Sequence, residues 1–325
     1  MANIPSGFDS YAILGVQADY DTLAVAATAG RKIAIVGEEL DGTVEQIQSD
    51  SFSGDANSKD AVDGDVDAGG TLRHNLTLET APLFAKAICR SFATAGAPSD
   101  YTHTIKTGSG ALPAYTIEVP IATDVANYKL IESAVLDTKG FEIRNKGFFQ
   151  VQLGYVGKKA DTTTTPHFVT PDDWTGGTEL HHRLLAAADV KLDGSAVGRI
   201  TRLQCNIAND VDREVRQLGS DGERIAAPAG TQKVTGTVDV YFDDPATFFA
   251  KTAAGVYVAF DFTWTISATR SMQLVLPRVK LQRQHPKAST PKSVMLSLPF
   301  VASKDSVEAS QIKFVIKNGI VGTKY

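Results

Sequence analysis

The chain has 325 residues, of which 43% are hydrophobic and 21% charged, and its formal net charge is -5. This is the composition of a globular protein that can bury a core, so it excludes an intrinsically disordered chain. The acidic balance argues against a surface built to grip nucleic acid, because phosphate affinity comes mainly from clustered Lys and Arg.

The first elements expected along the chain are a hairpin turn at Asp41-Gly42 and a long acidic loop over residues 49–70, which is rich in Asp, Ser and Gly. A strand is predicted at Leu72–Leu78, because apolar and polar residues alternate there. A helix is predicted over Thr80–Phe92, with Thr80 as its N-cap and an early proline. Alternation predicts two further strands at Tyr115–Ile121 and Phe149–Tyr155.

The second half continues this pattern. A helix is predicted at Glu179–Ala188 and another at Asp244–Gly255. In Val258–Ile266 every second residue is apolar and the residues between are Ala, Asp or Thr, which is typical of a half-buried antiparallel strand. Three further strands are predicted, at Val234–Phe242, Val294–Phe300 and Ile312–Ile316.

Three anchors suggest an internal duplication. Two of the three expected helices contain Phe-Ala-Lys, at Phe84–Lys86 and at Phe249–Lys251, which are 165 residues apart. Leu-Asp-Gly recurs at 40–42 and 192–194, and the strand at 149–158 aligns with 294–303. Alternating strands also resemble one another by chance, so coincidence is the alternative. Duplication predicts a first domain over residues 1–165 and a second over 166–325, joined at the polar stretch 158–166.

No motif for chemistry is found. The sequence has no GxSxG, GxGxxG, GxxxxGK[ST] or HExxH, and we therefore expect no enzyme activity and no cofactor. Asp63, Asp65 and Asp67 have the spacing of a calcium loop, but the required glycine and closing glutamate are missing, so no metal site is expected. Cys89 and Cys205 read as small buried hydrophobes, although a bridge between them stays open.

Several stretches resemble the major tail tube proteins of siphophages, in particular the longer kind with two tube domains. They are Ser10–Thr22, Gly69–Phe84, Gly219–Asp244 with the strand Val234–Phe242, and Leu276–Asp305. An aspartate at position 21 stands where the family usually has glycine.

The resemblance implies a mainly β fold: two tandem tail-tube-like domains, each a β-sandwich or barrel with a flanking helix. It also implies rings that stack into a hollow tube for genome ejection. With two domains per chain, three copies would form a pseudo-hexameric ring. The implied partners are further copies, the tape measure, tail terminator and distal tail proteins, and double-stranded DNA that passes without specific binding. The implied location is the virion tail, after synthesis in the host cytoplasm.

The acidic loop and the N-terminal arm are the candidate ring-stacking contacts, and the alternative is that both are simply mobile surface. The candidate residues of the loop are Phe52, Asp55, Asp60, Asp63, Asp65 and Asp67. No apolar run is long enough to cross a bilayer and no secretion signal is recognised at the N-terminus, so no membrane partner is expected. The alternatives are a tube or needle subunit of a bacterial injection system, and a β-sandwich decoration or binding module of a virion.

Overall fold

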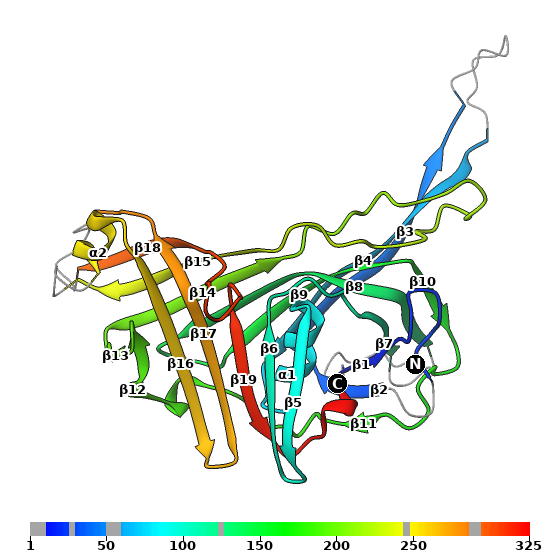
Figure 1. Ribbon diagram of the computed structural model, residues 1–325. Helices are drawn as coiled ribbons and strands as arrows, with labels where there is room; N and C mark the ends of the chain where they lie inside the picture. Colours follow the sequence, from blue (N-terminus) through cyan, green and yellow to red (C-terminus); the bar gives the residue numbers. More distant parts are fainter. Residues whose placement is uncertain (1–10, 26–29, 50–59, 123–126, 243–247, 286–293) are drawn as a thin grey trace, which may run out of the picture.

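The computed structural model describes residues 11–25, 30–49, 60–122, 127–242, 248–285 and 294–325. The fold is mainly β, as the sequence predicts (Figure 1). Its strands are β1 (Tyr11–Val16), β2 (Gly30–Ala34), β3 (Gly37–Ile47), β4 (Val62–Asn75), β5 (Ser91–Ala97), β6 (Asp100–Lys106), β7 (Ala114–Ala122), β8 (Asn127–Arg144), β9 (Gln150–Gly157), β10 (Lys159–Thr163), β11 (Asp172–Asp173), β12 (Leu185–Leu192), β13 (Ser195–Ala196), β14 (Ile200–Ala208), β15 (Lys233–Tyr241), β16 (Tyr257–Ser267), β17 (Arg270–Leu281), β18 (Met295–Ala302) and β19 (Lys313–Asn318). Two α-helices, α1 (Ala81–Ile88) and α2 (Phe249–Ala254), and the 3-10 helices η2 (His182–Leu184) and η3 (Gly322–Lys324) complete it.

The strands form two long ladders that share a core. One runs β3-β4-β9-β8-β14-β15-β18 and the other β5-β6-β19-β17-β16-β12, and they meet where the end of β17 pairs with β18. The first part of β8 pairs with β7 and β10, and β7 continues the sheet through β1, β2 and β11. The helix α1 packs between the ladders with all its apolar side chains buried.

All seven predicted strands are present. In β16 the alternation places Val258, Phe260, Phe262 and Trp264 in the core. The two predicted helices that contain Phe-Ala-Lys are also confirmed, although both are shorter than expected. The first ends at Ile88, because β5 begins at Ser91. The second, α2, starts at Phe249, and residues 243–247 before it are outside the described part. Gly255 ends α2 in the left-handed conformation, at φ 65°.

Thr80 occupies the N-cap position of α1, as predicted, but its side chain does not cap the helix, because its hydroxyl accepts from the Thr77 N–H and bonds to the buried ring of His74. The helix predicted at Glu179–Ala188 is wrong: η2 occupies its middle and β12 begins at Leu185, pairing with β16. The helix-forming Leu-Ala-Ala-Ala run at 185–188 is overridden by this tertiary pairing.

The strand order β3-β4-β9 recurs as β14-β15-β18, with the same registers. In β4, Gly70 lies between Leu40 and Tyr155; in β15, Gly236 lies between Cys205 and Phe300. All four of these flanking residues are buried. A Cβ on Gly70 would lie 2.0 Å from the Glu39 carbonyl oxygen, and one on Gly236 would lie 2.1 Å from the carbonyl oxygen of Gln204. Both glycines thus allow a close approach of the preceding strand.

The recurrence does not support one of the three sequence matches, the Leu-Asp-Gly at 40–42 and 192–194. Leu40 corresponds to Cys205 in register, not to Leu192. Asp41-Gly42 lies inside β3, so the turn predicted there is wrong, whereas Asp193-Gly194 does form a turn, between β12 and β13.

Candidate assembly interface

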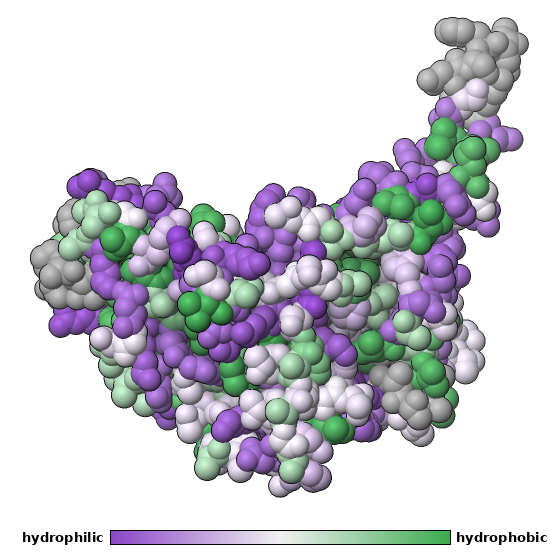
Figure 2. Space-filling view, viewed as in Figure 1, coloured by the Kyte–Doolittle hydropathy of each residue, from purple (hydrophilic) through white to green (hydrophobic). Residues whose placement is uncertain are grey.

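The hairpin of β3 and β4 projects from the body of the molecule (Figure 1). We call residues 44–66 the outer hairpin; its described parts are 44–49 and 60–66. Apolar residues lie among polar ones on its surface (Figure 2), and Val44, Ile47 and Val62 are 49%, 50% and 63% exposed. An apolar group held in solvent by a regular hairpin marks a surface used for contact with another molecule.

The structure corrects the prediction of a loop over residues 49–70. Asp63, Asp65 and Asp67 lie in β4 and are exposed, whereas Gly64 and Val66 are half-buried. The register with β3 shifts between Val44 and Gln46, which interrupts the alternation, and the acidic composition concealed the strand in the sequence. Asp60 lies just before β4 and is exposed, whereas Phe52 and Asp55 are outside the described residues.

A long segment from the other half lies along the base of this hairpin. We call residues 209–232, which connect β14 to β15, the strap. Beyond the last β9 partner of β4, the strap takes over the free edge: the Val66 N–H donates to the Gly222 carbonyl at 3.0 Å, and Arg216 donates to the Val66 carbonyl at 3.0 Å. The strap therefore protects an edge that β9 leaves open.

Arg224 anchors the strap. Its side chain is 1% exposed and donates to the carbonyls of Gly157 at 2.8 Å and Arg213 at 2.7 Å, while also pairing with Asp67. Arg216 pairs with Asp65 at 3.5 Å. Two of the predicted stacking aspartates, Asp65 and Asp67, thus contact the strap, and sequence reasoning missed both arginines because they lie about 150 residues away.

The outer edge of β3 differs from that of its counterpart β14. The edge of β14 is covered by β8 in a ladder that includes Leu203 opposite Ile143 and Cys205 opposite Phe141. In β3 the outward groups of Leu40 are met by side chains instead: its N–H donates to Glu38 at 2.9 Å and its carbonyl accepts from Lys129. The Gly42 N–H donates to Asp41 at 2.9 Å.

The comparison with known families decides the identity. The chain matches the model of a family described as phage tail tube protein over residues 7–302. The chain belongs to this family. No match was found among curated proteins. Family membership makes this tail tube protein a structural component of the virion tail that assembles with copies of itself and with other tail proteins. Within the described residues, no helix is long and apolar enough to cross a membrane.

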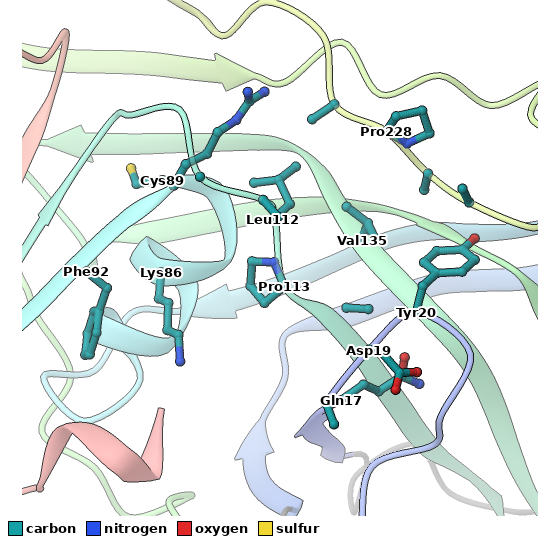
Figure 3. A pocket seen from close by; sticks show the side chains of 18 of the residues that line it. Gln17, Asp19, Tyr20, Lys86, Cys89, Phe92, Leu112, Pro113, Val135 and Pro228 are labelled. Atoms are coloured by element: carbon teal, nitrogen blue, oxygen red, sulfur yellow. The ribbon is translucent and has the colours of Figure 1, made fainter.

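A cleft of about 820 Å³ in this tail tube protein lies where the strap crosses the first half (Figure 3). Tyr20 and Pro228 line one side and Lys86, Cys89 and Phe92 the other. Its ionisable groups serve the fold: Lys86 donates to the Tyr325 carbonyl, and Arg90 donates to Gly230 at 2.7 Å. Burial raises the pKa of Cys89 to about 12, so its thiol is not a nucleophile at neutral pH.

The remaining sequence candidates show no catalytic or metal-binding geometry. The two cysteines are free thiols, both buried. Among the described residues, no group of three or more His, Cys, Asp or Glu side chains could hold a metal ion. Trp174 packs against Tyr325, with 5.4 Å between the ring centroids, and the Arg31 guanidinium lies over its ring at 5.5 Å. The site that stands out is therefore the projecting hairpin with its open edge.

Proposed function

We propose that the chain is the major tail tube protein of a siphophage and polymerises into stacked rings that form the conduit for genome ejection. The observation that carries this proposal is the recurrence of the strand unit β3-β4-β9 as β14-β15-β18. The outer edge of β14 is paired with β8, whereas the equivalent edge of β3 is not paired with a strand. An unpaired sheet edge such as that of β3 is suited to edge-to-edge assembly.

The recurrence supports two tube domains per chain, residues 1–165 and 166–325. The pairing of β8 with β14 is then a domain-to-domain contact within one subunit. If neighbouring subunits repeat that contact, three chains close a ring of six domains. Residues 172–181 belong to the second domain by sequence, but they pair with strands of the first domain through β11, Glu179 and His181. The first strand that pairs within the second domain is β12, which pairs with β16.

Ring stacking is assigned to the outer hairpin. Asp60 and Asp63 are exposed there, and Val62 lies between them. Phe52 and Asp55 belong to the same proposed surface by their position in the sequence, and Asp65 and Asp67 contribute by fixing the base of the hairpin to the strap. Tape measure, terminator and distal tail proteins are the proposed partners at the tube ends.

The net charge of -5 supports passage of double-stranded DNA without binding, because tight binding needs clustered positive charge. The site of action is then the virion tail after synthesis in the host cytoplasm.

Negative-stain electron microscopy of the concentrated protein tests the proposal. We expect hollow rings with threefold or pseudo-sixfold symmetry, stacked into tubes, and a dissociated ring with the mass of three chains. Rings of one or six chains would contradict the two-domain count, and a protein that stays monomeric at high concentration would contradict the proposal itself. The double variant Asp60→Asn, Asp63→Asn should still form rings but stack differently from wild type; unchanged stacking would remove these two carboxylates from the interface.

A further inference from the structure

The two halves of the chain are joined by strand β14, which pairs antiparallel with β8 over residues 202–208 and 138–144; we call this pairing the junction. The same kind of pairing can be looked for between two copies of the chain. Leu203, Cys205 and Ile207 are all buried there. Since β3 corresponds to β14, with Leu40 in the place of Cys205, the outer edge of β3 is equivalent to a covered edge.

The counterpart of β8 in the second half can be identified by register. Val135 and Leu136 of β8 pair with Val156 and Tyr155 of β9. Lys280 and Leu281 of β17 pair in the same way with Val301 and Phe300 of β18. The part of β8 that covers β14 therefore corresponds to the residues that follow β17.

Those residues continue beside β18. The Gln282 N–H donates to the Pro299 carbonyl at 2.8 Å, where the first half pairs Thr138 with Gly154. Gln282–His285 thus correspond to residues 138–141. Gln282, Arg283 and His285 are exposed, whereas Lys139 and Phe141 in the first half are buried under β14.

The two segments differ in charge. Strand β3 contains Glu38, Glu39, Asp41 and Glu45 and no basic residue, although Glu38 pairs with Lys129 and Glu39 with Arg73. Residues 282–285 contain Arg283 and no acidic residue. Opposite charges on two surfaces favour their association and suppress pairing of either surface with itself. The basic segment is therefore matched to β3 and not to a second basic segment.

The grooves beside the two helices show a parallel difference. In the first half, the cleft lined by Lys86 and Val135 is crossed by strap residues 226–229. In the second half, a groove of about 490 Å³ lies at the equivalent place, lined by Thr252, Lys280 and Gln282, and no part of the strap lines it. The segment equivalent to the strap is the outer hairpin, which projects away from its own chain (Figure 1).

We propose that β3 of one copy pairs antiparallel with residues 282–285 of a second copy, with Leu40 opposite His285, Asp41 opposite Gln284 and Thr43 opposite Gln282. The proposal rests on the proposed ring assembly and specifies its subunit contact. Because the two surfaces differ, the contact is head-to-tail, and repetition closes a ring or extends a filament.

Disulfide trapping tests the register. The N–H and C=O of Leu40 point away from β4, so Asp41 and Thr43 would form non-hydrogen-bonded pairs with the added strand. In such pairs the Cα atoms are about 4.5 Å apart, within disulfide range. The variant Asp41→Cys, Gln284→Cys should therefore give a ladder of covalent dimers and trimers on mild oxidation of assembled protein, seen on non-reducing gels.

The matched control is Gly37→Cys, Gln284→Cys. A Cβ on Gly37 meets nothing within 4 Å, so the substitution is tolerated, but the pair is four residues, or about 13 Å, out of register. We expect crosslinking about tenfold lower than for the in-register pair, since the two sulfurs cannot meet. Wild type reports the background from Cys89 and Cys205, which are both buried.

Each outcome discriminates. If rings form but neither Asp41→Cys, Gln284→Cys nor a second in-register pair, Thr43→Cys, Gln282→Cys, crosslinks between chains, the proposed contact is wrong while the ring proposal stands. Equal crosslinking of the Gly37→Cys control would also overturn the register. If wild type forms no rings, the proposed function fails, and the contact that rests on it fails with it.

Discussion

The strap and the outer hairpin occupy the same place in the two halves and differ in length by one residue, yet they have opposite surroundings. The strap follows β14, whose edge is covered by β8, and it is tied to the first half by Arg216 and Arg224. The outer hairpin follows β3, whose edge meets only side chains, and it projects with Val44 and Val62 exposed. This difference underlies the proposal that the chain makes the contact once internally and a second time with another copy.

The largest expected effect tests whether the two halves are equivalent. Gly70→Ala and Gly236→Ala should each lower the free energy of unfolding by about 4 kcal/mol, because the new Cβ would lie 2.0 Å and 2.1 Å from carbonyl oxygens of the adjacent strand. Urea unfolding measures this. Gly37→Ala, at an open position, is the matched control and should change stability by less than about 0.5 kcal/mol. A harmless Gly236→Ala with a damaging Gly70→Ala would mean that the repeat is not sterically equivalent.

The next effect tests the anchoring of the strap. Arg224→Ala removes a buried guanidinium that bonds to carbonyls of Gly157 and Arg213, and should cost about 3 kcal/mol. Trypsin should also cut the variant faster in the strap, after Arg213 and Arg216. Arg73→Ala breaks only an exposed ion pair with Glu39 and should cost below about 1 kcal/mol. Equal stability and equal proteolysis of the Arg224 and Arg73 variants would show that the strap is held by other contacts.

A smaller effect is expected from a buried charge in the junction of β8 with β14, a feature that the open edge of β3 lacks. Lys139 is buried in the junction over the ring of Phe314, at 5.0 Å, and burial lowers its pKa to about 8. In the unfolded chain the pKa is about 10.4, so the cost of burying the charge is fully present below pH ~8 and disappears as the pH rises towards 10.4. Lys139→Met should thus raise the free energy of unfolding at pH 7, by about 2 kcal/mol.

The wild-type protein should gain stability relative to Lys139→Met between pH 8 and pH ~10, as measured by urea unfolding across that range. Lys233→Met, at a 65% exposed side chain, should have little effect at any pH. A pH-independent difference between wild type and Lys139→Met would show that the ammonium is not desolvated in the junction.

Periodicity made the strands of the body predictable. The alternation in Val258–Ile266 identified both the element and its buried face, since a half-buried antiparallel strand leaves a direct trace in the sequence. The same rule does not find residues 62–67, the outer part of β4, because Asp and Gly stand there in place of apolar residues and the register with β3 shifts. The rule detects a strand by its buried face, and these residues are exposed or half-buried.

The sequence by itself determined the β-rich class, the two Phe-Ala-Lys helices, the absence of catalytic motifs and the resemblance to tail tube proteins, because each depends on local pattern or composition. Tertiary structure decided what depends on long-range pairing: that Leu40 matches Cys205, that Arg224 anchors the strap, and that β14 is covered while β3 is open. Strand registers depend on contacts between residues far apart in the sequence, such as Gly70 with Tyr155 and Cys205 with Phe141, and such contacts leave no periodic signal in one chain.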